Sequence, residues 1–397
     1  MKKRILFVDD EPKILHGLER MLRPFRKEWD TAFAESGSQA LEMMARESFD
    51  VVISDMRMPR MDGAELLEEI KQRHPGSVRI ILSGHSSQEL ALKSVGPAHQ
   101  YLAKPCNADS LRSTIERALS LQQLLTNERV RELVAKTGSV PSLPSVYLKI
   151  QQILRSPDAS IPEIGKVLAQ DVGMSAKLLQ IANSAFFGIR GSVSTPTEAA
   201  FRLGVDTVKA LVLSLHVFST FDRAQLARLR LESVSSHSMS VAVLAGRLAR
   251  AEKLEASQVD NAFTAGLLHD LGKVVLAANV PEDYEKALEV ARARGITVWE
   301  AELESLGATH AEVGAYLLGL WGLSHPIVEA LAYHHRPGGH ANHSFSPLTA
   351  IHVANVLQQE GAEPPTGARC SEIDLNYLEK LGIAGRLPAW RQLRDSA

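Results

Sequence analysis

The first third of the chain alternates short apolar runs with longer stretches of mixed character. The apolar runs lie near residues 4–9, 30–34, 50–55, 78–83 and 100–103. Runs of this length, bounded by polar or turn residues, predict strands that are buried on both faces. The stretches between them predict helices. Regular alternation of strand and helix predicts a doubly wound, flavodoxin-like α/β domain over residues 1–122.

Beyond residue 109 the chain shows only the helical period. Apolar residues recur at three- and four-residue steps from Leu111 to Leu133, which predicts one long or nearly continuous helix over 109–136. Residues 123–138 would then be a helical linker that continues the fifth helix of the first domain. The apolar stripe could pair two copies of the chain as a homodimer, or it could pack on the chain's own domains. The sequence leaves both interpretations open.

A proline-rich segment, Val140–Pro144, separates the linker from a second domain. We find no strand-like alternation after it, so residues 139–357 are expected to form an all-α domain. Residues 358–397 are expected to form a C-terminal tail that packs on this domain. The complete chain is therefore predicted to be multidomain, with an α/β domain followed by an all-helical one.

Composition is that of an ordinary soluble globular protein, with 45% apolar and 23% charged residues in a chain of 397. A formal charge of −2 gives no general attraction to nucleic acid or anionic membrane. The two cysteines, Cys106 and Cys370, lie in unrelated contexts and do not indicate a disulfide framework. The sequence contains neither a signal peptide nor an apolar run of membrane-spanning length. We therefore expect a cytoplasmic protein without membrane insertion.

Polar residues whose side chains could bind a metal ion or react with phosphate follow four of the predicted strands. Asp9 and Asp10 end the first strand, and Asp55 ends the third. Because parallel strands present their carboxyl ends at one edge, these three acids are expected to form an oxygen-rich site suited to Mg²⁺. Ser83 and Lys104 end two further strands and could contact a bound phosphoryl group. A carboxylate at such a site is a nucleophile toward phosphate once a cation neutralises the incoming charge.

These residues resemble the receiver domain of two-component response regulators. The resemblance covers about residues 1–122 in order and rests on Asp9-Asp10, Asp55, Met58-Pro59, Asp62-Gly63, Ser83-Gly84 and Lys104-Pro105. It implies that a sensor histidine kinase phosphorylates Asp55. The implied Mg²⁺ ligands are Asp9, Asp10, Asp55 and the carbonyl of Arg57. By the same resemblance Lys104 pairs with the phosphoryl group, while Ser83 and Tyr101 form the switch that reports phosphorylation.

Histidine is the unusual feature of the second domain, because nine of the fourteen lie between His237 and His352. A single histidine on an apolar helix face is usually a core residue. Several of them together with an adjacent aspartate, His269-Asp270, are poorly explained as core residues. Imidazole and carboxylate ligands together suit Fe, Mn or Zn better than Mg.

This histidine pattern resembles the HD superfamily of metal-dependent phosphohydrolases. His237, His269 and Asp270 match its first three ligand positions. The extra ligands of the two-metal HD-GYP phosphodiesterases are matched by His310, His334 and His335, and their active-site lysine is matched by Lys273. Two features depart from the pattern. The last ligand position, normally aspartate, is Asn355, and an amide is a poorer ligand than a carboxylate. The segment Arg336–Gly339 also lacks the motif that names the HD-GYP group.

A second resemblance in this half is to the HDOD output domain. It spans about residues 139–357 and the tail, and rests on segments 143–147, 171–188, 200–204, 375–382 and 387–390. The resemblance implies an HD-related helical domain that acts in signalling, usually without catalysis.

Two hypotheses for the output follow. In the first, the HDOD domain binds a partner protein or a nucleotide such as a cyclic dinucleotide without turning it over, which Asn355 and the missing motif favour. In the second, the retained ligands and Lys273 form a metal-dependent phosphodiesterase controlled by the receiver domain. No helix-turn-helix pattern or basic stripe indicates a DNA partner.

Overall fold

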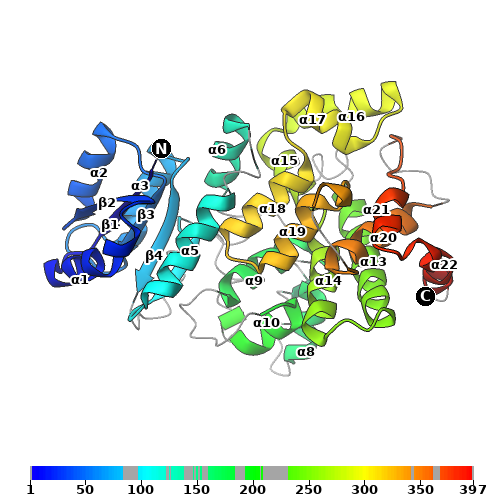
Figure 1. Ribbon diagram of the computed structural model, residues 1–397, viewed down its shortest axis with the longest axis horizontal. Helices are drawn as coiled ribbons and strands as arrows, with labels where there is room; N and C mark the ends of the chain where they lie inside the picture. Colours follow the sequence, from blue (N-terminus) through cyan, green and yellow to red (C-terminus); the bar gives the residue numbers. More distant parts are fainter. Residues whose placement is uncertain are drawn as a thin grey trace. The chain divides into compact units, whose positions relative to one another are not determined.

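The computed structural model (Figure 1) describes residues 2–83, 97–121, 127–137, 160–183, 193–205, 231–340, 344–360 and 367–395, with isolated positions between these ranges. The chain divides into two compact units. The first unit contains residues 1–139 and two short later segments. The second contains the rest of the chain, and each unit is described by itself below.

The first unit is built on a parallel sheet of five strands in the order β2-β1-β3-β4-β5. The strands are β1 (Lys3–Val8), β2 (Trp29–Ala34), β3 (Val51–Asp55), β4 (Val78–Ser83) and β5 (Gln100–Ala103). All five predicted strands are confirmed within a residue or two of their predicted ends. The strand order reverses between β1 and β3, which is where an open α/β sheet forms a crevice outside its carboxyl ends.

Helices cover this sheet because its strands are apolar on both faces. They are α1 (Pro12–Leu22), the short 3₁₀ helix η1 (Arg23–Phe25), α2 (Gly37–Arg46), α3 (Gly63–Arg73) and α5 (Ala108–Leu121). Every residue of β3 is buried. Met44 of α2 and Leu67 of α3 share one core cluster with Val52 and Ile81 of the sheet. The doubly wound α/β prediction is therefore confirmed.

The stretch 109–136, predicted as one long or nearly continuous helix, contains two separate helices. The helix α5 is followed by a separate helix, α6 (Glu128–Lys136), which begins anew. Asn127 has an extended backbone, with ψ of 109°, and its side chain accepts a hydrogen bond from the Val130 amide. Asparagine is a strong N-cap because its short side chain can satisfy a free amide of the first turn. The apolar period continued across the break because both helices bury the same kind of stripe.

The end of α6 is bound to the sheet of its own unit by buried polar groups. The guanidinium of Arg79 on β4 donates from Nη2 to the carbonyl oxygen of Ala135 at 2.5 Å. His99 places Nε2 3.1 Å from the same oxygen. Cationic and N–H donors are favourable at the negative end of a helix dipole. Val134 and Ala135 are buried, so this part of the apolar stripe packs on the chain itself.

Among the described residues of the second unit the regular elements are all helices, apart from an isolated bridge between Thr297 and Arg369. The all-α prediction is therefore confirmed. Its helices are α8 (Ile161–Leu168), α9 (Val172–Ala182), α10 (Pro196–Leu203), α13 (Leu231–Ala251), α14 (Ala256–Leu268), α15 (Leu271–Asn279), α16 (Pro281–Arg294), α17 (Val298–Leu306), α18 (His310–Leu320), α19 (His325–Tyr333), η3 (Pro337–Gly339), α20 (Pro347–Gln359), α21 (Leu375–Lys380), η4 (Ala384–Arg386) and α22 (Leu387–Asp395).

Four of these helices, α13, α14, α19 and α20, pack against one another and form the centre of the unit. A close approach between α13 and α14 is allowed by Gly266, where an added Cβ would lie 2.7 Å from Cα of Ala242. Gly272 allows a similar approach, because an added Cβ would collide with the carbonyl of His310. These contacts bring α13, α14, α15 and α18 together around the histidines.

Residues of the C-terminal tail pack on this helical unit. Trp390 is fully buried, and its indole Nε1 donates to Glu252 at 2.8 Å. The hydroxyl of Tyr377 lies 2.7 Å from that of Thr349 on α20. No helix within the described ranges is both long enough and apolar enough to cross a bilayer.

Candidate functional site

The acid site lies at the carboxyl ends of β1 and β3, where the strand order reverses. Asp9 and Asp55 are both at least nine-tenths buried, whereas Asp10 is exposed. The Lys104 ammonium donates to Asp9 Oδ2 at 2.7 Å and also to Asp55 Oδ1. Two acids from neighbouring strands and the predicted lysine thus meet at one point.

The Asp55 carboxyl is held in a fixed orientation. Its Oδ2 accepts the backbone N–H of Arg57 at 2.5 Å, and its Oδ1 faces Lys104. Burial raises the pKa of Asp55 above its usual range, although Lys104 acts in the opposite direction. A partly desolvated carboxylate with one oxygen on an ammonium is a nucleophile whose reactivity depends on nearby cations.

The predicted switch residues are described only in part. Ser83 ends β4 beside this site, but its side chain and the following Gly84 lie outside the described residues. Tyr101 on β5 is partly buried and packs against the core cluster that contains Ile81.

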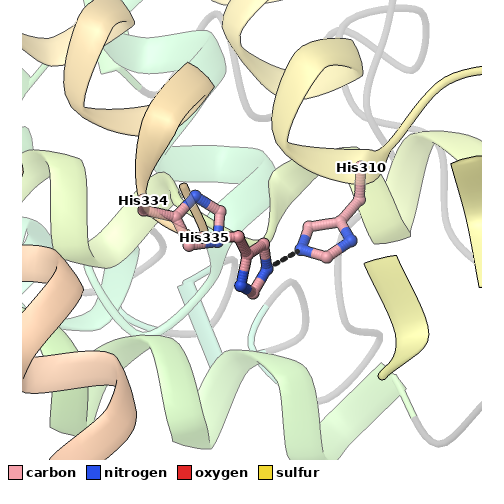
Figure 2. A group of neighbouring side chains, drawn as sticks. All are labelled: His310, His334 and His335. Atoms are coloured by element: carbon pink, nitrogen blue, oxygen red, sulfur yellow. Dashed lines mark hydrogen bonds between the residues drawn. The ribbon is translucent and has the colours of Figure 1, made fainter. Parts of the chain in front are cut away.

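Three histidines of the second unit, His310, His334 and His335, lie close together at the ends of helices (Figure 2). His269 follows α14, His310 begins α18, and His334-His335 follow α19. Their ligand atoms form two groups, each with all atoms within 4.8 Å of one another: one is His237, His269 and Asp270, and the other is His310, His334 and His335. The structure therefore brings together six of the predicted ligand residues.

Hydrogen bonds fix the tautomer of three buried rings in this cluster. Nδ1 of His269 donates to the Gly266 carbonyl at 2.7 Å, and Nδ1 of His334 donates to the Leu331 carbonyl at 2.7 Å. Each ring then carries its lone pair on Nε2, and both Nε2 atoms are buried without a hydrogen-bond partner. In His310 the Nδ1 atom faces the Glu302 carboxylate, so its Nε2 also points inward.

Asp270 lies between the two groups. Its Oδ1 atom is 3.5 Å from Nε2 of His269 and 3.3 Å from Nε2 of His310, and it has no hydrogen-bond partner. Its Oδ2 accepts from the Lys273 ammonium at 2.7 Å. Burial alone would raise the pKa of Asp270, but His269 and Lys273 hold it well below its usual range. The carboxylate is therefore ionised and shared by both groups.

Asn355 occupies the edge of the cluster. Its Oδ1 accepts from Nε2 of His237 at 2.8 Å and from Nε2 of Gln359 at 2.9 Å. The amide thus engages His237 but contributes no negative charge. His335 completes the opposite side, where its Nε2 lies 2.9 Å from Nε2 of His310 and its Nδ1 lies 3.1 Å from the Ser371 hydroxyl.

Sequence reasoning missed one functional candidate, Glu302 on α17. Its carboxylate is fully buried and accepts both the backbone N–H of His310 at 2.7 Å and the ring Nδ1–H at 2.6 Å. A signal existed in the sequence: Glu302 is four residues from both Val298 and Leu306, which places it on their apolar stripe. An acid on such a stripe is expected to have a buried partner.

The chemistry of this cluster fits a transition metal. Nε2 of His269, Nε2 of His334 and Oδ1 of Asp270 are buried acceptors without donors. Leaving such atoms unpaired costs free energy that a bound cation would recover. Imidazole nitrogens with one carboxylate are ligands preferred by Zn, Fe and Mn.

Family comparisons agree with the two units. The model of the response regulator receiver domain matches residues 5–116, and the model of the HDOD domain matches residues 140–337. An uncharacterized protein from Treponema pallidum (strain Nichols) is 28% identical over 246 residues, covering 62% of this chain and 47% of that protein. The DNA-binding transcriptional regulator NtrC from Escherichia coli (strain K12) is 36% identical over 162 residues, covering 39% of this chain and 34% of NtrC.

Among solved structures, the MmoQ response regulator from Methylococcus capsulatus (Bath) has a TM-score of 0.48 and 21% identity, covering 63% of this chain and 98% of its own. The chain spans about half or less of the two curated relatives named above. The parallel sheet and its acid site, with the matched models, define a response regulator receiver domain joined to an all-helical domain. The chain belongs to the two-component response regulators and carries an HDOD domain after its receiver.

Proposed function

We propose that phosphorylation of Asp55 controls the HDOD domain, which acts through binding a partner protein or nucleotide. The observation that carries the first part is the meeting of Asp9, Asp55 and Lys104 at the switch point of the sheet. A phosphodonor such as a histidine kinase would transfer its phosphoryl group to an oxygen of Asp55. The new O–P bond replaces the N–P bond of the donor phosphohistidine.

Asp9, Asp10, Asp55 and the Arg57 carbonyl would hold Mg²⁺ at this site. The ion supplies positive charge that lets two anionic groups approach each other. Lys104 already contacts Asp55, so it is placed to pair with a phosphoryl oxygen after transfer. Ser83 and Tyr101 are proposed to report that change.

Incubation with acetyl phosphate and Mg²⁺, followed by intact-mass measurement, tests this proposal. We expect the addition of one phosphoryl group to the wild type and none to Asp55→Asn. Asp30→Asn is the matched control, because Asp30 lies on the neighbouring strand β2 with a mostly exposed side chain. Phosphorylation of Asp55→Asn at the wild-type rate would show that another residue is the acceptor.

For the output, Asn355 supports binding rather than turnover, since it contacts His237 without a ligand charge. We propose that the cluster of His237, His269, Asp270, His310, His334 and His335 nevertheless holds Fe, Mn or Zn. The described residues contain the unpaired inward nitrogens that such an ion requires.

A second candidate function, a metal-dependent phosphodiesterase, is favoured by that same cluster and by Lys273. The side chain of Lys273 is one-fifth exposed and could reach both Asp270 and a bound phosphate. A bound metal supplies an activated water for phosphodiester hydrolysis.

Metal content per chain and hydrolysis of a cyclic dinucleotide would be measured in the wild type and in His269→Ala/Asp270→Ala. Metal without hydrolysis supports the binding output, and metal-dependent hydrolysis lost in the double variant supports the enzyme.

A further inference from the structure

Glu302 has a place in the histidine cluster that the family resemblance does not assign. It comes from α17, outside the segments that supply the candidate ligands, and reaches the first residue of α18. One oxygen, Oε2, accepts two hydrogen bonds from His310, at 2.7 Å from the backbone nitrogen and 2.6 Å from Nδ1. The side chain is fully buried, and its other oxygen has no hydrogen-bond partner.

The partner of Nδ1 distinguishes His310 from the other two rings whose tautomer is fixed. In His269 and His334 the Nδ1–H donates to neutral backbone carbonyls. In His310 it donates to a carboxylate, which stabilises positive charge on the ring and makes the inward Nε2 more basic. That Nε2 lies 3.3 Å from Asp270 and 2.9 Å from His335, at the junction of the two groups.

We infer that Glu302 is a positioning residue that orients His310 and strengthens its Nε2 as a metal ligand. This inference rests on the proposed metal site. A carboxylate behind a ligating imidazole fixes both the tautomer and the ring orientation, and its loss weakens metal binding about 10- to 100-fold. His310 is the ligand that gains this support.

A purely structural role for Glu302 is the competing explanation, because it also accepts an amide of the first turn of α18. The same turn offers a matched control. Glu312 accepts from the Thr309 backbone nitrogen at 2.8 Å, and the Thr309 hydroxyl caps the Glu312 amide at 3.2 Å. This capping box stabilises the same helix end. Glu312 accepts from Thr309 and, at 3.4 Å, from Arg336, neither of which is a candidate ligand.

The experiment compares full-length wild type, Glu302→Gln and Glu312→Gln. Glutamine keeps an acceptor for both His310 donors but removes the charge. Zn²⁺ affinity is measured by chelator competition, thermal stability by calorimetry, and the histidine tautomers by ¹⁵N NMR. We expect Glu302→Gln to bind Zn²⁺ about 10- to 100-fold more weakly with Nδ1 of His310 still protonated. Glu312→Gln is expected to bind Zn²⁺ like the wild type.

Each remaining result decides against the inference in a distinct way. Equal Zn²⁺ affinity in wild type and Glu302→Gln overturns the role of Glu302 and leaves the metal site standing. Parallel losses of stability and affinity in both variants assign Glu302 to helix capping. If the wild type binds no Zn²⁺, the metal site and the inference fail together. If Glu302→Gln does not fold, the wild-type spectrum decides, because an unprotonated Nδ1 on His310 contradicts the inference.

Discussion

The acid site of the receiver and the histidine cluster of the HDOD domain differ in how their acceptor atoms are satisfied. In the receiver a cation of the chain itself, Lys104, bonds both Asp9 and Asp55. In the HDOD domain the inward nitrogens of His269 and His334 have no donor. Both sites gather acceptors from several elements. In the receiver a lysine bonds both acids, whereas in the histidine cluster Lys273 bonds only Oδ2 of Asp270 and leaves Asp270 Oδ1 and the two imidazole nitrogens without a donor among the described residues.

This difference has a physical consequence for cation binding. An ion entering the receiver site shares its ligands with Lys104, so the net gain in free energy is small and the ion can exchange. An ion entering the histidine cluster would meet buried lone pairs that have lost their hydration, so the gain is larger. Exchangeable Mg²⁺ suits a phosphorylation cycle, whereas a retained transition metal suits a structural or hydrolytic site.

The largest expected effect is that of metal on the stability of the helical unit. At a thousandfold excess over its Kd, Zn²⁺ should raise the free energy of unfolding by about 4 kcal/mol. Calorimetry with and without a chelator measures this shift. His269→Ala/Asp270→Ala should abolish it, and His325→Ala, at a mostly exposed side chain, should retain it. An equal shift in the double variant would place the ion elsewhere.

The second effect is the pH dependence of the metal-free protein. Burial lowers the pKa of His269 from 6.5 to about 4. Between these values the unfolded chain holds a proton that the folded chain excludes, so stability falls as pH drops from about 6.5 to 4. The loss from this residue is roughly 3 kcal/mol. Urea denaturation across this pH range should show a flatter profile for His269→Gln. A wild-type stability that rises on acidification through this range would contradict the assignment.

The third effect converts the receiver site into one with unsatisfied acceptors. Lys104→Met removes the ammonium shared by Asp9 and Asp55. In the absence of Mg²⁺ this should lower the free energy of unfolding by roughly 2 kcal/mol. Saturating Mg²⁺ should recover more stability in this variant than in the wild type, because the ion no longer competes with lysine. Denaturation of Lys13→Met, at an exposed residue of α1, is the control. If Mg²⁺ stabilises this variant no more than the wild type, the proposal that Lys104 and Mg²⁺ compete for the same carboxylates is wrong.

The smallest effect concerns the charge of the histidine cluster. Asn355→Asp keeps an acceptor for His237 and adds the carboxylate that the HD superfamily normally has at its last ligand position. We expect Zn²⁺ affinity to rise about tenfold, equivalent to about 1.4 kcal/mol. Chelator competition measures the change, and Gln359→Glu controls for an added charge one turn away on the same helix. Unchanged affinity would show that position 355 lies outside the metal's reach.

Much of the acid site could be predicted from the sequence. Buried β-branched runs such as Val51–Ile53 have few alternatives to a strand, and a parallel sheet brings its carboxyl ends to one edge. Asp9, Asp55 and Lys104 follow such runs directly, so their proximity was implied by local order. The candidate ligands His269 and His310 were also predicted, because the sequence around them resembles the ligand positions of the HD superfamily.

The role of Glu302 could not be predicted in the same way. Glu302 and Glu304 both lie in α17, but only Glu302 is buried against His310. Periodicity places Glu302 on an apolar stripe without saying which partner that stripe meets. The partner depends on how the short turn after α17 orients α18, because His310 is only eight residues from Glu302 but lies on the next helix.

The sequence by itself therefore determined the two fold classes and the acid cluster, because these depend on local period and strand ends. Most candidate ligands of the second domain were implied by the resemblance to the HD superfamily. Tertiary structure alone decided where the linker helix breaks and what it binds. Asn127 permits a new helix to begin, but the contacts of Arg79 and His99 with Ala135 join residues from β4, β5 and α6. Such contacts satisfy buried donors across long separations in sequence, and no local pattern records them.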